Sequence, residues 1–138
     1  MIVIEKNEQY ALIDPVAESI DKAISDDIEK KVAGLYREGY SNFILDFKNV
    51  NDIAEPGISL IKKIEKISKN ENGILVITTE NEELVELLDT YKMEELVIMA
   101  TKEEAIEAIY LNELENDFRE EEDESADEFG EDPSADYE

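Results

Sequence analysis

The sequence contains no cysteine and no histidine in its 138 residues. Without cysteine the chain forms no disulfide and has no thiol nucleophile, and without histidine it lacks the side chain that most often transfers protons near neutral pH. Neither a Ser-His-Asp nor a Cys-His catalytic site can therefore be built within this chain. Zinc-finger ligand sets are excluded for the same reason.

Long apolar runs are also missing. The longest, such as Leu96 to Ala100, have the length of a strand, whereas a helix that spans a bilayer needs about 20 apolar residues. The segment Met1 to Lys6 has no basic start followed by a long apolar stretch, so it does not resemble a signal peptide. We therefore expect a cytoplasmic protein that has no contact with a membrane.

Basic residues are scarce. Lysine and arginine number 13 against 38 acidic residues, which gives a formal net charge of −25. Such a chain repels nucleic acids and anionic membranes, because both are polyanions. Its charged partners are expected to be basic protein surfaces.

Half of this charge is concentrated at the C-terminus. Residues 113–138 carry 14 acidic residues and one base, Arg119. Beyond Phe118 the only large apolar residues are Phe129 and Tyr137, so this segment cannot bury enough apolar surface to offset the entropy of ordering it. We expect a domain at 1–112 and an acidic tail at 113–138, mostly disordered from about residue 117. The tail is either a solubilising segment or a binding segment.

Within residues 1–112, short apolar strands alternate with amphipathic helices. Such alternation predicts an α/β fold, with a partly parallel sheet covered by helices. Ser25 has the character of an N-cap for the first helix, and Gly39 that of its C-terminal cap. Strands are expected at 1–6, 9–14, 43–47, 73–79 and 96–99, and helices follow Ser25, Pro56, Asn81 and Thr101.

The second helix opens with Pro56 and Gly57, and proline is favoured in the first turn of a helix. Its apolar stripe should face the sheet and leave a basic outer face beside this opening. That outer face is either an ordinary solvated surface or a docking surface for an acidic partner or for the tail of the protein itself. The stripe consists of Ile58, Ile61, Ile64 and Ile67, and the outer face of Lys62, Lys63, Lys66 and Lys69.

Residues 1–112 resemble a STAS domain of the anti-sigma-factor antagonist type. The resemblance lies in the strand and loop Phe43–Ile53, in the strand Gly-Ile-Leu-Val-Ile-Thr that starts at Gly73, and in the helix start Thr-Lys-Glu-Glu-Ala-Ile at Thr101. It implies a mixed sheet with about four helices and a role in partner switching. The domain would bind an anti-sigma factor or a serine kinase of the anti-sigma type, and phosphorylation of a serine before a glycine would break that complex.

The sequence departs from the family pattern Asp-Ser-Ser-Gly at this phosphorylation motif. It has Ala54, Glu55, Pro56 and Gly57 there, so only the glycine is kept. Because proline has no hydroxyl, the usual switch cannot operate. Two interpretations stay open: Pro56 starts the helix and the switch is lost, or Glu55 supplies a permanent charge near the phosphosite. Ser59 and Ser41 are candidate substitute acceptors.

The combined hypothesis is a non-catalytic protein-binding module without a cofactor or metal site. It would dock a protein partner through the loop 52–57 and the second helix, with the residues Asp52, Ala54, Glu55, Pro56, Gly57, Ser59, Lys62, Lys63 and Lys66. Carboxylates such as Asp46 have no accompanying nucleophile, phosphate loop or metal-ligand spacing, so we expect no enzyme activity. The alternative is a polyanionic decoy, whose acidic tail occupies the basic site of a nucleic-acid-binding protein.

Overall fold

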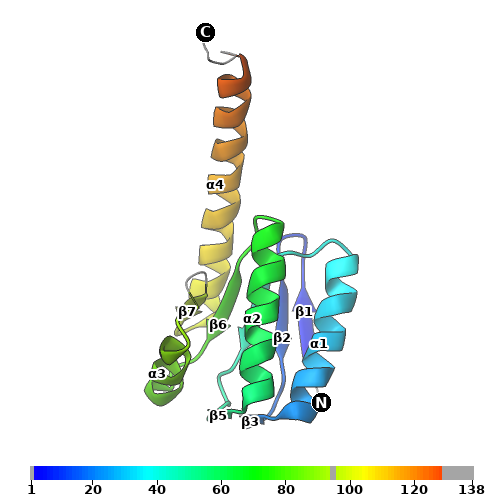
Figure 1. Ribbon diagram of the computed structural model, residues 1–138, viewed down its shortest axis with the longest axis vertical. Coiled ribbons are helices and arrows are strands. Elements are labelled where there is room, and N and C mark those ends of the chain that lie inside the picture. The colour runs from blue at the N-terminus through cyan, green and yellow to red at the C-terminus, as the bar shows by residue number, and fades with distance from the viewer. Residues whose placement is uncertain (1, 94–95, 129–138) are drawn as a thin grey trace.

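The computed structural model describes residues 2–93 and 96–128, and it describes side chains up to residue 117. Its centre is a five-stranded mixed sheet (Figure 1) with the strand order β1-β2-β4-β6-β7. The first pair is antiparallel and the other three pairs are parallel. The strands are β1 (Val3–Lys6), β2 (Ala11–Asp14), β4 (Phe43–Asp46), β6 (Leu75–Thr78) and β7 (Val97–Met99).

Four helices cover the two faces of this sheet unequally. The helices are α1 (Lys22–Arg37), α2 (Glu55–Asn70), α3 (Glu82–Thr90) and α4 (Lys102–Glu128). Helices α1, α2 and α3 share one apolar core with the sheet, and α4 packs on the opposite face. The mixed α/β architecture with four helices confirms the fold class that the sequence predicts.

The strand residues alternate between these two cores. Phe43 and Leu45 of β4 face the helices α1 to α3, whereas Ile44 faces Ala105 and Ile109 of α4. Neighbouring strands follow the same alternation, because successive side chains of a strand point to opposite faces. The continuous apolar runs in the sequence therefore do correspond to strands that are covered on both sides.

A second, two-stranded sheet was not predicted. Strands β3 (Ser19–Ile20) and β5 (Asp52–Ile53) pair in parallel, with Ser19 opposite Asp52 and Ile20 opposite Ile53. Strands this short have no detectable periodicity, so the sequence around Val16 to Ala23 is ambiguous by itself. They lie at the end of the molecule where α1 and α2 begin (Figure 1).

The start of the first helix differs from the prediction. Asp21, not Ser25, is the N-cap, and its carboxylate accepts a hydrogen bond of 2.9 Å from the Ile24 N–H. Asp21 directly follows β3, so the chain leaves its extended conformation there, and Ser25 becomes a buried residue within the helix. The C-terminal prediction is confirmed, since Gly39 has a φ of 108° in the left-handed region.

Helix α4 begins as predicted but continues further. The Glu104 N–H donates to Thr101 Oγ1, and the Thr101 N–H donates to Glu104 Oε1, each at 3.2 Å, which is a capping box. The helical backbone then runs into the acidic segment as far as Glu128, since no proline or glycine interrupts residues 102–128. Residues 129–138 of the expected tail lie outside the described residues.

Among the side chains that the structure describes, which extend to residue 117, the contacts farthest along α4 lie near the turn between α2 and β6. Asn112 Nδ2 and Asn116 Nδ2 both donate to the Asn72 carbonyl, at 2.9 and 2.8 Å, and Asn42 Nδ2 donates to Glu113 Oε1 at 3.0 Å. Beyond this point the ribbon projects away from the sheet (Figure 1). Among the described residues, none of the helices is both long enough and apolar enough to cross a membrane.

Amide exchange should divide α4 into two parts. We expect slow exchange at residues 105–109, which pack on the sheet, and fast exchange at residues 120–128. An exposed helix without tertiary packing opens at almost no cost in free energy. Exchange followed by mass spectrometry or NMR measures this directly, and slow exchange throughout 120–128 in the isolated protein would contradict the expectation.

Candidate functional site

The small β3–β5 sheet brings the starts of α1 and α2 side by side. The Asn51 N–H donates to the Glu18 carbonyl at 2.7 Å, and the Ala54 N–H donates to the Ile20 carbonyl at 3.0 Å. Ser19 Oγ adds a side-chain hydrogen bond of 3.1 Å to Asp52 Oδ2. These bonds hold the loop before α2 against the loop before α1, so the segment 52–57 rests on a defined support.

Gly57 allows α2 to begin directly on this support. A methyl group at this position would lie 2.6 Å from Ile53 Cγ2 and 2.9 Å from Ile20 Cγ2. Real side chains do not approach so closely, so the side chains of the small sheet leave room only for glycine. Ala54 is the N-cap, and its carbonyl accepts hydrogen bonds from the N–H groups of Gly57 and Ile58 at 2.8 and 3.2 Å. Gly57 therefore has a structural role in the site.

Glu55 and Pro56 occupy the exposed side of the same turn. They are the first two residues of α2, and both side chains are exposed. The missing N–H of proline costs nothing in the first turn of a helix, and a carboxylate is favoured there by the helix dipole. The predicted first-turn role of Pro56 is confirmed. Ser59 is exposed on α2, whereas Ser41 lies against Gly73, beyond the opposite end of this helix.

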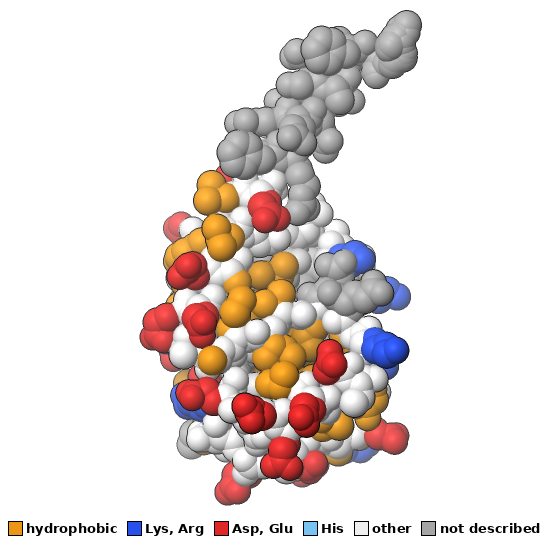
Figure 2. All heavy atoms as spheres, turned by 90° about the vertical axis from the view of Figure 1, so that its left-hand side faces the viewer, with side chains coloured by type: hydrophobic (Ala, Val, Ile, Leu, Met, Phe, Trp, Pro, Cys, Tyr) orange, Lys and Arg blue, Asp and Glu red, His pale blue; other side chains and the backbone are white. Residues whose placement is uncertain are grey.

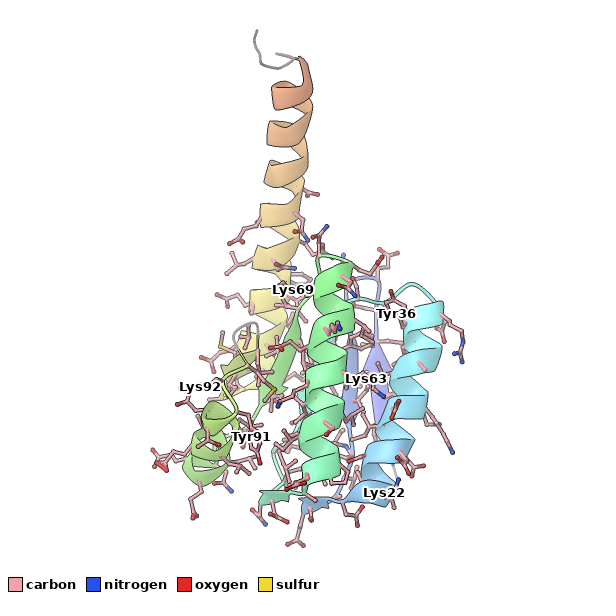
Figure 3. The ribbon with its side chains drawn as sticks, viewed as in Figure 1. Lys22, Tyr36, Lys63, Lys69, Tyr91 and Lys92 are labelled. Atoms are coloured by element: carbon pink, nitrogen blue, oxygen red, sulfur yellow. The ribbon has the colours of Figure 1, made fainter. Side chains whose placement is uncertain are left out.

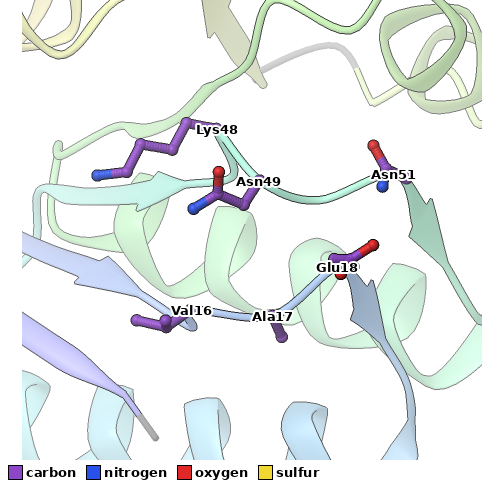
Figure 4. Close-up of a pocket in the computed structure, with 6 residues that line it drawn as sticks. All are labelled: Val16, Ala17, Glu18, Lys48, Asn49 and Asn51. Carbon is purple, nitrogen blue, oxygen red and sulfur yellow. The ribbon is translucent and has the colours of Figure 1, made fainter.

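A hollow of about 700 Å³ opens beside this junction. Figure 4 shows Val16, Ala17 and Glu18 on one side of it, and Lys48, Asn49 and Asn51 on the other. Val16 has a φ of 49°, which is strained for a β-branched residue, and its N–H donates to Asp14 Oδ1 at 2.9 Å. No sequence signal indicated this hollow, because it forms only where two distant loops meet.

Lys48 binds the carboxylates at the ends of the two adjacent strands. Its Nζ lies 3.2 Å from Asp46 Oδ2 and 3.3 Å from Asp14 Oδ2. The hydrogen bond to Asp46 is the largest cause that raises the pKa of Lys48 above its ordinary value, and the hydrogen bond to Asp14 is the second. Asp46 also accepts a hydrogen bond of 3.0 Å from Thr78 Oγ1. The buried Asp46 thus organises the end of the sheet.

The predicted lysine cluster divides between two surfaces. Lys63 Nζ pairs with Glu29 Oε2 of α1 at 2.7 Å, whereas Lys62 Nζ lies 5.4 Å from the centre of the Tyr91 ring. Figure 3 shows Lys63 on the α1 side of α2, and Tyr91 and Lys92 near α3. The sequence spacing placed these lysines on one helix but did not reveal which neighbouring helix each one faces.

The lysines on the α3 side line a groove, which we call the lysine groove. Its volume is about 500 Å³. Four lysines and one carboxylate are among its lining residues, which are Lys62, Glu65, Lys66, Lys69, Tyr91, Lys92 and Met93. Tyr91 and Lys92 were missed by sequence reasoning because they follow α3, which is distant from α2 in the chain. In a chain of net charge −25, a groove in which four lysines outnumber one glutamate favours an acidic occupant.

Comparison with known families gives one match that covers most of the chain. The model of the STAS domain matches residues 1–108. No curated protein matches the sequence significantly.

Solved structures of the same fold show low sequence identity. SpoIIAA of Bacillus in its phosphorylated form has a TM-score of 0.63 at 14% identity, over 79% of this chain and 99% of that one. A STAS domain protein of Planctomyces limnophilus has a TM-score of 0.67 at 18% identity, over 78% and 96%. An anti-sigma factor antagonist of Mycobacterium paratuberculosis has 0.62 at 14%, over 80% and 93%. At these identities the likeness shows the fold alone.

Replacing Gly57 by alanine should destabilise the fold even though alanine favours helices. The added methyl group would overlap Ile53 and Ile20, and we expect a loss of roughly 1–3 kcal/mol in the free energy of unfolding. Gly34→Ala is the matched control, because a methyl group there meets nothing within 4 Å and should stabilise α1 by about 0.5–1 kcal/mol. Urea unfolding of both variants tests the comparison, and equal effects would contradict the tight packing at Gly57.

Proposed function

Because the chain belongs to the STAS domain family, we propose that it is a non-catalytic protein-binding module in a partner-switching pathway. It resembles an anti-sigma-factor antagonist, and its partner is an anti-sigma factor or a serine kinase of the anti-sigma type. The partner docks on the loop 52–57 and on the adjacent outer face of α2. This assignment of partner and surface comes from the family resemblance together with the geometry of the junction.

The observation that carries the proposal is the construction of the junction at the start of α2. Gly57 and Ile53 are buried against the small sheet, while Asp52, Glu55 and Pro56 are exposed on the same support. A surface of this kind is preorganised, so little conformational entropy is lost when a partner binds. The hollow beside Asn49 and Asn51 extends the surface and offers polar side chains at its rim.

The switch by phosphorylation is lost at the usual position. Pro56 has no hydroxyl and fits the first turn of α2 without strain, so the fold does not depend on a serine there. Two states of the docking surface are compatible with this geometry. Either the partner binds constitutively, or the exposed Glu55 carboxylate keeps a negative charge next to position 56, where the family places phosphate, and weakens the complex.

The lysine groove supports docking of an acidic segment of the partner beside the junction. Lys62 and Lys66 are both exposed and lie one helical turn apart on the same side of α2. Exposed charge pairs are individually weak, but several like charges on one surface steer an oppositely charged partner.

A second function is favoured by the direction of α4. Its acidic part projects from the domain (Figure 1), so it could enter the basic site of a nucleic-acid-binding protein as a polyanionic decoy without obstruction by the sheet. The folded domain would then serve as an anchor.

A chain that ends at Asp117 separates the two functions, because it keeps the contacts of Asn112 and Asn116 with Asn72. Unchanged partner affinity supports docking on α2, and complete loss supports the decoy.

Charge reversal in the lysine groove should weaken binding of the partner. We expect Lys62→Glu/Lys66→Glu to reduce affinity for a purified anti-sigma kinase of the same organism, mainly through a slower association rate at low salt. Both positions are exposed, so the free energy of unfolding should change by no more than about 0.5 kcal/mol each. Titrations at low and high salt measure the effect.

The matched control is Lys30→Glu/Lys31→Glu on the exposed side of α1, which changes the net charge by the same amount. It should affect binding much less. Equal weakening by both double variants would mean that only the total charge of the protein matters, and would remove the lysine groove from the docking surface.

Incubation with an anti-sigma serine kinase should leave the start of α2 unmodified. Position 56 has no acceptor, and Ser59 is displaced by almost one helical turn from the family position. Phosphopeptide mapping by mass spectrometry gives the answer, with Ser59→Ala as the control. Phosphate on Ser59 together with loss of partner binding would show that the switch has moved along α2.

A further inference from the structure

The main sheet ends in an open strand on the side of α3 and α4. Strand β7 pairs only with β6, with Val97 opposite Val76 and Met99 opposite Thr78. The Thr79 N–H donates to the Met99 carbonyl at 3.0 Å, so the peptide groups of Met99 point toward β6. Because the peptide groups of successive residues point to opposite sides of a strand, the N–H and C=O of Ile98 point away from β6, toward the open edge. Among the described residues, no strand pairs with this outer edge.

The two edges of the sheet differ in their chemistry. Strand β1 carries charged residues that pair with neighbouring elements, through Glu5 to Lys102 at 2.6 Å and Lys6 to Glu38 at 2.9 Å. Charged side chains are a common protection of an edge strand. Strand β7 has the sequence Val-Ile-Met, with neither charge nor proline. Of the two edges, β7 is therefore the one that lacks protection by charged side chains.

Two hollows flank β7, one on each face of the sheet. The hollow on the α3 side has a volume of about 350 Å³ and is lined by Leu88, Asp89, Lys92, Met93, Leu96 and Ile98. The hollow on the α4 side has a volume of about 180 Å³ and is lined by Met99, Glu104, Glu107, Ala108 and Leu111. Side chains of an extended segment alternate between the two faces of a sheet. A segment paired with β7 would therefore reach both hollows in turn.

The charges around the hollows select the composition of such a segment. Glu104 and Glu107 border the α4-side hollow, and Figure 2 shows acidic side chains around the hydrophobic side chains of this face. Basic residues with long apolar stems would cover Leu111 and reach these carboxylates. Four of the six residues that line the other hollow are apolar, and its two charged residues, Asp89 and Lys92, have opposite signs, so it suits valine, isoleucine or leucine. A second copy of the chain is disfavoured, because two molecules of charge −25 repel each other.

We propose that β7 is a docking strand for an extended segment of a protein partner in which basic and apolar residues alternate. The segment adds to the sheet beside β7, places its apolar side chains in the α3-side hollow and directs its basic side chains to Glu104 and Glu107. This mode of binding derives affinity from main-chain hydrogen bonds and specificity from the alternating side chains. It is a surface separate from the loop 52–57, and its α3-side hollow shares Lys92 and Met93, but neither Lys62 nor Lys66, with the lysine groove.

The probe is a short acetylated and amidated peptide of alternating lysine and valine, titrated against the full chain with amide shifts followed by NMR. We expect the largest shifts at residues 97–99. In an extended peptide, the N–H groups of the valines point to one side and those of the lysines to the other. One peptide carries N-methyl groups on all valines and a second on all inner lysines. Only the peptide whose methylated N–H groups face β7 should lose binding. A peptide of equal composition with separate lysine and valine blocks should bind much more weakly.

Two matched pairs of variants test the α4-side hollow. Leu111→Asn should weaken peptide binding roughly threefold, whereas Leu114→Asn should not, although the two leucines are 56% and 55% exposed and only Leu111 is among the lining residues. Glu107→Gln should weaken binding about threefold at low salt, and Glu103→Gln, with the same change of charge, should have little effect.

Several results would overturn the proposal. These are no binding at millimolar peptide, equal loss with both N-methylated peptides, or shifts confined to the lysine groove. A dimer in sedimentation experiments that is broken by Leu111→Asn would assign the edge to a second copy of the chain. Lys62→Glu/Lys66→Glu should leave peptide binding unchanged, so that failure here and failure of the docking site on α2 remain distinguishable.

Discussion

Burial of the two central strands on both faces is the constraint on which this fold depends. Every residue of β4 and β6 is buried, so each face of the sheet requires a helical cover. Helices α1, α2 and α3 supply one cover, and the first turns of α4 supply the other. The parallel connections that place α1 and α2 on the same face also bring their N-termini to one end of the sheet. The candidate docking end follows from this arrangement.

At that end, the residues that hold the structure are distinct from those that are exposed to solvent. Gly57 is required because any side chain there would overlap Ile20 and Ile53. Position 56 tolerates proline because the N–H groups in the first turn of a helix have no acceptor within the helix. The packing requirement at position 57 is therefore independent of which residue occupies position 56.

The charge of the protein is distributed so that its surfaces differ in sign. The lysine groove beside α2 is basic, the hollow between β7 and α4 is bordered by glutamates, and the projecting part of α4 is strongly acidic. Exposed pairs between such groups are weak and screened by salt. Each of these exposed charges therefore contributes little to the stability of the fold.

The sequence alone predicted the features that depend on local pattern. Apolar runs identified the strands of the main sheet, helical spacing identified the stripes of α1 and α2, and Thr101 with Glu104 identified the start of α4. The motif around residues 43–57 pointed to the family. These features were predictable because hydrophobic periodicity, caps and motifs are properties of neighbouring residues.

The tertiary structure decided what depends on residues distant in the chain. The N-cap of α1 is Asp21 and not Ser25, because the strand β3 ends directly before Asp21. A strand of two residues has no periodicity from which the sequence could predict it. Lys62 contacts Tyr91 after α3, whereas Lys63 pairs with Glu29 of α1. The helical spacing predicts where each lysine lies around α2, but it does not predict which neighbouring helix lies on that side. The open edge of β7 likewise exists only once the strand order is known, since an edge is defined by the absence of a neighbouring strand and not by the residues of the strand itself.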